Sequence, residues 1–205
     1  MTTYSWPSER VLIPQTFSWG PAEVIGGTPS PYTGDEQTGE VPFSHRWVVT
    51  LGWPPATDFR VQHSRIGFLT KLRRSHRILI PHFGFVKNGF APFGTLRAAT
   101  VATTAAQGAT SIALTPSSGA TVLRGDVVAL VTAIGTQVVM CTANTDTSAA
   151  ALPFEPPLRA IVSSGSSVTC VAPAAKFRLD DGEWSAQFTP GEAQPIVVSF
   201  RETIL

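Results

Sequence analysis

The residues that could carry out metal or nucleophilic chemistry are few and scattered along the chain. None of the four histidines pairs with a cysteine at metal-ligand spacing, and neither H-E-x-x-H nor C-x-x-C occurs; they are His45, His63, His76 and His82. No glycine-rich phosphate loop opens a helix, and no G-x-S-x-G nucleophile elbow is present. We therefore predict no catalytic residue, no metal site and no cofactor, so the chain is not expected to be an enzyme.

The acidic residues and the two cysteines also favour structural roles. The acids that come in groups lie in predicted loops or hairpin ends, where they favour turns and solvation; they are Asp35, Glu36, Asp180, Asp181 and Glu183. Cys141 and Cys170 lie within alternating apolar runs. This placement predicts buried thiols in a reducing compartment, with a bridge between neighbouring strands as the alternative.

The composition limits the kinds of partner the chain can have. Its formal net charge is +1, so no global field would attract nucleic acid or an anionic membrane. No run of about 18 apolar residues or secretory signal is found, which predicts no membrane span and a protein made and used in the cytosol. Charged residues make up 14% of the chain against about 25% on average, while 43% are hydrophobic. Large protein–protein contacts would use such a surface, although a solvated β surface rich in small polar residues is an alternative.

The residue pattern predicts a mainly β fold with one α-helix. Residues 46–53 alternate as a strand does, and a second strand is expected at 78–81. Between them, Phe59, Gln62, Ile66, Leu69 and Leu72 recur on one helical face, which predicts a helix over about 58–73 capped by Thr57 or Asp58. The basic residues Arg73, Arg74 and Arg77 follow, where cations suit the negative pole of a helix.

The composition changes near Gly94, which predicts two domains. From 98 to 175 the chain has no Trp or Lys and reads as short strands at 111–114, 127–132, 136–142, 158–161 and 167–172. Their spacing is that of a small barrel or sandwich. After it, 176–180 is expected to pair with 183–188 across Asp181-Gly182, and a last strand covers 196–202. We therefore assign 1–94 plus 175–205 to a discontinuous β domain and 95–174 to an inserted β domain.

Candidate interface residues lie near the start of the chain and after the helix. Residues 1–20 are rich in aromatics without a period and read as an extended arm or edge strand, in which Trp6, Phe17 and Trp19 are the expected anchors. The basic run of Lys71, Arg73, Arg74 and Arg77 suits a helix end or an inter-subunit salt bridge, with phosphate contact as a weaker reading. Trp47 fits either the core or an interface, and Arg124-Gly125-Asp126 fits a turn better than an adhesion signal.

The order of these pieces resembles a distal tail protein of long-tailed, non-contractile bacteriophages. The resemblance covers nearly the whole chain, and the segments that carry it are Trp6-Pro7, Phe17-Ser18-Trp19-Gly20, the strand at 46–51, the helix, and the segments at 106–114, 123–128, 153–159 and 177–180. It implies a homo-oligomeric ring, usually of six copies, between the last tail-tube ring and the central hub. The outer domain would form the ring and continue the tube. The insert would project outward to hold side fibres or receptor-binding proteins, or decorate the tip. The protein would belong to the virion, at the tail tip or baseplate, and be assembled in the host cytoplasm without sequence-specific nucleic acid binding.

Two other functions remain open from the sequence. A carbohydrate- or receptor-binding module would use loop aromatics, for which the candidates are Trp53, Phe83, Phe85, Phe90 and Phe93. A peptidoglycan hydrolase of the tail is the third reading, although no catalytic motif supports it.

Overall fold

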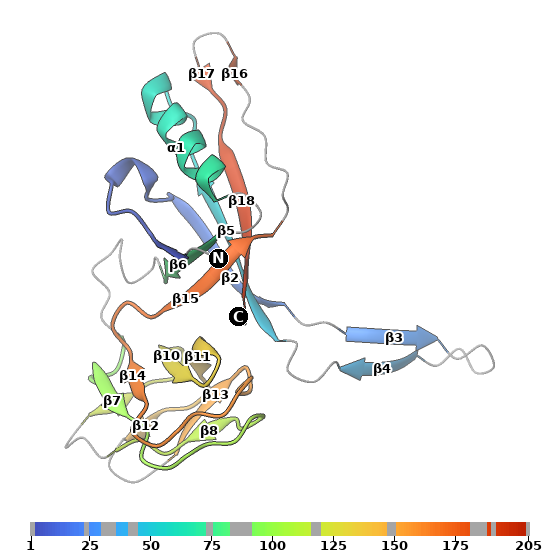
Figure 1. Cartoon of the computed structure of the whole chain (residues 1–205), viewed down its shortest axis with the longest axis vertical. Helices are drawn as coiled ribbons and strands as arrows, with labels where there is room; N and C mark the ends of the chain where they lie inside the picture. The colour runs from blue at the N-terminus through green and yellow to red at the C-terminus, as the bar shows by residue number, and fades with distance from the viewer. Residues whose placement is uncertain are drawn as a thin grey trace. The chain divides into compact units, whose positions relative to one another are not determined.

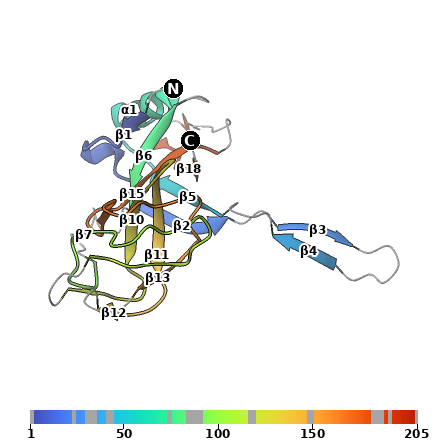
Figure 2. The ribbon, with the colours of Figure 1, turned by 60° about the horizontal axis from the view of Figure 1, so that its bottom comes forward.

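The structure is a computed structural model that describes residues 3–22, 25–29, 36–40, 45–72, 76–82, 92–115, 120–146, 151–180, 188–189 and 192–203. These residues are mainly β with a single α-helix, as the sequence predicts (Figures 1 and 2). No helix in this part of the chain has the length and apolar content needed to cross a membrane.

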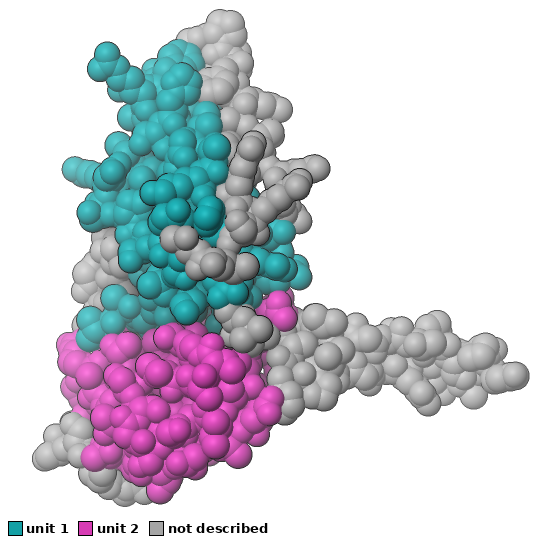
Figure 3. Space-filling view, in the orientation of Figure 1, with its two compact units in different colours: residues 1–20, 48–91, 171–205 teal, residues 21–47, 92–170 magenta. Residues whose placement is uncertain are grey.

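The chain divides into two compact units (Figure 3). The first unit combines residues 1–20, 48–91 and 171–205, and the second combines 21–47 and 92–170. The second unit therefore takes residues 21–47 as well as most of the 95–174 segment. Two hydrogen bonds tie the end of 21–47 to the rest of its unit: the Trp47 indole donates to the Val138 carbonyl at 2.7 Å, and Arg159 Nε donates to the His45 carbonyl at 2.7 Å. Trp47 is thus a buried residue, only 4% exposed.

The first unit is built on a six-stranded sheet. Its strand order is β1 (Thr3–Ser5), β6 (Arg77–Pro81), β15 (Ala174–Leu179), β18 (Ile196–Glu202), β5 (Arg46–Trp53) and β2 (Thr16–Ala22). β1 runs parallel to β6, whereas β6, β15, β18 and β5 pair antiparallel. The predicted strands at 46–53 and 196–202 are confirmed. Their alternation of buried and more exposed residues, such as buried Ile196, Val198 and Phe200, is the pattern of a strand with one face in a core.

The single helix, α1 (Phe59–Lys71), is held by polar side chains as well as by apolar packing. Asp58 caps it by accepting from the Arg60 N–H at 2.8 Å. Gln62 donates to the Gln194 carbonyl at 2.9 Å, and Arg65 donates to the Val11 and Pro54 carbonyls. Because Arg65 is largely withdrawn from water, burial lowers its pKa.

The N-terminal segment is part of the first unit's fold and not a detached arm. β1 and β2 are the two outer strands of the sheet, and the short 3-10 helix η1 (Arg10–Leu12) lies between them in sequence. Leu12 is 3% exposed, and its carbonyl accepts from the Trp53 indole at 3.2 Å. The edge-strand reading of residues 1–20 is therefore the one that agrees with the structure.

The second unit contains a closed six-stranded barrel. The strand order is β7 (Ala98–Thr100), β14 (Ser167–Thr169), β10 (Val127–Thr132), β11 (Gly135–Cys141), β13 (Leu152–Glu155) and β8 (Ser111–Ile112), with every pair antiparallel. A bridge between Val101 and Leu114 joins the two end strands. The Ala102 N–H donates to the Ala113 carbonyl, and the Thr115 N–H to the Thr100 carbonyl, both at 2.8 Å. The sheet therefore has no unpaired edge along this seam.

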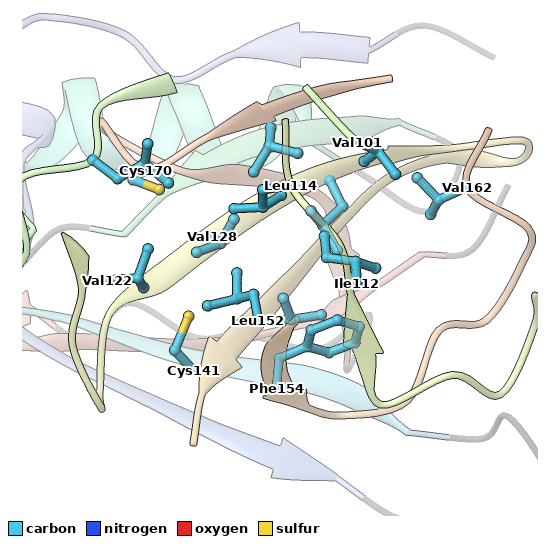
Figure 4. Close-up of a cluster of buried hydrophobic side chains, with 14 of the residues drawn as sticks. Val101, Ile112, Leu114, Val122, Val128, Cys141, Leu152, Phe154, Val162 and Cys170 are labelled. Atoms are coloured by element: carbon cyan, nitrogen blue, oxygen red, sulfur yellow. The ribbon is translucent and has the colours of Figure 1, made fainter. Parts of the chain in front are cut away.

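The barrel interior is filled by apolar side chains (Figure 4). They come from β8, β10, β11, β13 and β14, from the segments between them, and from β9 (Thr121–Val122), which pairs with β12 (Thr145–Asp146). Ala99 of β7 packs against this core. Aliphatic residues with one aromatic, Phe154, make up most of this core, as expected for a barrel too narrow to hold a ligand. Among its members are Val101, Ile112, Leu114, Val122, Val128, Cys141, Leu152, Val162 and Cys170.

Two predicted strands are corrected. Residues 158–161 form no strand. Leu158 follows two prolines, which lack the N–H donors that a strand needs. The Leu158 N–H instead donates to the Ala109 carbonyl, and the Leu158 carbonyl accepts from the Gly108 N–H. The expected hairpin between 176–180 and 183–188 is also wrong where it can be followed. β15 pairs with β6 and β18, and Phe188 in β16 (Phe188–Thr189) pairs with Ala193 in β17 (Glu192–Ala193). Residues 183–187 lie outside the described residues.

One further pair of strands forms a ribbon by itself. β3 (Ile25–Pro29) and β4 (Glu36–Glu40) pair antiparallel from Ile25 opposite Glu40 to Pro29 opposite Glu36. Within the described residues, neither strand joins another sheet.

Candidate interaction surfaces

The described residues bring no metal-binding cluster together. No group of three or more His, Cys, Asp or Glu side chains that could hold a metal ion is found in this part of the chain. His45 belongs to the second unit, and the other three histidines belong to the first. Of these, His82 packs among aromatic rings, and its burial lowers the pKa of the imidazole.

Trp6 lies in an aromatic cluster of the first unit. Its ring stacks on that of Trp53, with centroids 6.4 Å apart and planes 8° from parallel. The Phe68 and Phe200 rings complete the cluster in T-shaped contacts, with their centroids 5.2 and 6.4 Å from that of Trp6. Trp6 remains half-buried, whereas Trp53 is 1% exposed. Trp6 therefore ties the segment after β1 to both the helix and the sheet, and it still presents part of its ring to solvent.

Phe17 and Trp19 form a second aromatic group on β2. Both rings contact His82, at centroid distances of 5.4 and 5.1 Å, and Trp19 also meets the edge of Phe177 at 5.3 Å. Phe177 is fully buried, whereas Phe17 and Trp19 are half-buried. The predicted anchors thus lie on the outer strand of the sheet and contribute to the fold of their own unit.

The basic residues after the helix are only partly visible. Arg77 is the first residue of β6, where it pairs in register with Thr3. Arg73 and Arg74 lie outside the described residues. Earlier in the sequence, the Lys71 ammonium lies 4.5 Å from the centre of the Tyr4 ring, which also makes a T-shaped contact with His76. Sequence reasoning included Lys71 in the basic run but missed its contact with Tyr4, because only the β1–β6 pairing places the start of the chain beside the end of the helix.

The exposed surface of α1 is a second feature that was missed. Arg60, His63 and Lys71 are exposed there, opposite the buried face of Gln62, Arg65 and Leu69. The helix contains no acidic residue. The signal was present in the sequence, since no Asp or Glu occurs between Phe59 and Gly125.

The aromatic residues considered for carbohydrate binding do not form one site. Trp53 is buried in the first unit and has no face free for a sugar ring. Phe93, in the second unit, is 65% exposed. Phe83, Phe85 and Phe90 lie outside the described residues. Of the five candidates, Phe93 alone is seen to expose its ring.

The Arg124-Gly125-Asp126 tripeptide is a turn with a buried carboxylate. Asp126 is 1% exposed and accepts three backbone N–H bonds, from Phe93 at 2.6 Å, Gly94 at 3.0 Å and Leu123 at 2.9 Å. Gly125 adopts φ +91°, in the region that favours glycine. An adhesion signal needs an accessible aspartate, so the turn reading is supported. Asp126 also fixes residues 93–94, the point where the composition changes.

Cys141 and Cys170 are buried thiols inside the barrel. Burial is the main cause that raises the pKa of each to about 12. Cys141 ends β11 and Cys170 follows β14, and β10 lies between these two strands. Two strand spacings separate their backbones by roughly 10 Å, beyond the reach of a disulfide. The alternative of a bridge between neighbouring strands is therefore excluded.

Comparison of the sequence with protein-family models and with curated proteins finds no match.

Proposed function

We propose that this chain is a structural subunit of the tail tip of a long-tailed, non-contractile bacteriophage. Copies would close into a ring, with six as the expected number, between the tail tube and the central hub. In this proposal the discontinuous domain forms the ring and continues the tube. The barrel projects from it and anchors fibres or receptor-binding proteins, or decorates the tip.

The observation that carries the proposal is the open sheet of the first unit. In the described residues its end strands are β1 and β2, each paired on one side only. An outer strand presents a row of unpaired backbone groups on which another chain can add a strand. The two ends of the sheet are different strands, so contact between them is head-to-tail, and a head-to-tail contact generates a closed ring when its rotation closes.

The residues beside these two strands have the chemistry of interface anchors. Trp6 directly follows β1, and Phe17 and Trp19 lie on β2. Each ring is half-buried against its own unit, which fixes its orientation while part of its surface stays accessible. Rigid, partly exposed aromatic residues contribute strongly to protein–protein contacts.

The test is the mass and shape of the purified protein. Light scattering after gel filtration should give about 131 kDa for six copies of the 21.8 kDa chain, and electron microscopy should show rings. A protein that remains monomeric at tens of micromolar and binds a glycan would overturn the proposal in favour of the receptor-binding module. A cleared band on a cell-wall gel would favour the hydrolase.

A further inference from the structure

The charges of this chain are segregated along the sequence although its net charge is only +1. Residues 11–45 contain four acids, Glu23, Asp35, Glu36 and Glu40, and no Lys or Arg. Residues 59–125 contain nine Lys or Arg residues and no acid. The β3–β4 ribbon lies in the acidic segment, and α1 lies in the basic one. The two elements therefore carry charge of opposite sign.

The β3–β4 ribbon needs a surface to pack against. A two-stranded hairpin alone is marginally stable in water at best, because it has too few cross-strand contacts to offset the cost of ordering. In the described residues β3 and β4 pair with each other and with no other strand. A partner surface that complements the acidic charge of this segment would supply the missing contacts.

The exposed side of α1 has the properties that such a partner requires. Arg60, His63 and Lys71 are exposed, with the Lys71 ammonium over the Tyr4 ring, while the opposite side of the helix is buried in its own unit. Gly67 lies between the basic residues, and a Cβ built on it would meet no atom within 4 Å. The middle of the helix therefore offers room for close approach of a backbone. Asp58, at the helix start, already accepts from the Arg60 N–H.

We propose that the acidic β3–β4 ribbon of one copy docks on the basic side of α1 of the neighbouring copy. The inference rests on the proposed self-assembly, because a ring joins two different surfaces of identical chains. Electrostatic complementarity between these surfaces would select the head-to-tail arrangement and speed encounter. Assembly should accordingly weaken as salt increases, since exposed charges are screened.

Two charge-reversal variants test the docking. The ribbon variant carries Glu36→Lys and Glu40→Lys, and the helix variant carries Arg60→Glu and Lys71→Glu. In either variant alone, the ribbon and the exposed side of the helix carry charge of the same sign. The protein concentration at which half of the chains are assembled should therefore rise at least tenfold. In an equimolar mixture, alternating copies restore opposite charges at every contact, and the assembly should return. Far-UV circular dichroism checks that each variant is folded.

A matched control separates this contact from a general charge effect. Arg97→Glu with Arg124→Glu alters exposed residues of the second unit by the same total charge as the helix variant and should assemble like the wild type. If the wild type does not assemble, the proposed function fails whatever the variants do. If it assembles and both variants assemble equally well, the docking is wrong. A third outcome is that the equimolar mixture does not assemble, whereas a chain that carries all four substitutions does. The ribbon would then contact the helix of its own chain, which also overturns the proposal.

Discussion

Replacing Trp6 with alanine separates a role in folding from a role in assembly. Trp6 is half-buried, stacked on Trp53 and met by the edges of Phe68 and Phe200. A half-buried tryptophan removes roughly 100 Å² of apolar surface from water, which stabilises by about 2.5 kcal/mol. The stacked and edge contacts add about 0.5 kcal/mol or more. The substitution should therefore lower the free energy of unfolding by about 3 kcal/mol, a large share of the 5–15 kcal/mol typical of a native protein.

Urea unfolding at a concentration below that of assembly measures this loss. With a slope of about 2–3 kcal/mol/M, the midpoint should fall by about 1 M. Val197→Ala is the control, because Val197 is 64% exposed in the same sheet and its truncation should cost under about 1 kcal/mol. A Trp6→Ala protein with an unchanged midpoint but weakened assembly would refute the reasoning and make Trp6 purely an interface residue.

Two further predictions concern the second unit. Asp126→Ala leaves three backbone N–H groups without their acceptor and should lower the free energy of unfolding by about 3 kcal/mol or more. Gly94→Ala should lower it by at least about 2 kcal/mol, because the added Cβ would overlap the Thr121 carbonyl. Urea unfolding measures both losses. Since burial raises the pKa of Cys141 and Cys170 above 9.0 to about 12, the stability from their neutral thiols is complete below pH 9 and is lost as the pH rises toward 12. Between pH 9 and 12, the urea midpoint of the wild type should fall more steeply with pH than that of a protein in which both cysteines are replaced by alanine. Equal dependence on pH in the two proteins would contradict the assignment of both thiols as buried and neutral.

Elements with a strong local period could be predicted from the sequence. The strands at 46–53, 127–132 and 196–202 agree with the structure because each alternates buried and exposed positions or is continuously apolar. The helix was found because its apolar residues recur at helical spacing and Asp58 caps it. Phe59, one of the residues assigned to the buried face, is instead 40% exposed, since it lies in the first turn.

Pairings between distant parts of the chain could not be predicted in the same way. β1 has three residues and no period, and its place in the sheet depends on Thr3–Ser5 meeting Arg77–Leu79. β7 has three residues and β8 has two, so nothing in their sequences predicts that they close a barrel. For the candidate site, the aromatic residue types suggested Trp6, Phe17 and Trp19 as interface anchors, and this role stays a prediction. The sequence could not reveal that Trp6 and Trp19 also pack on their own unit.

The two units differ in what their backbones can offer to another chain. In the barrel, the Val101–Leu114 bridge and its flanking hydrogen bonds pair the end strands, so no edge along this seam can accept an additional strand. The sheet of the first unit, as far as it is described, ends in β1 and β2, each of which pairs with one neighbouring strand. Strand addition is therefore open to the first unit and closed to the barrel. A partner of the barrel along this seam would therefore have to be met through side chains, which suits the proposed role of a module that anchors fibres or receptor-binding proteins.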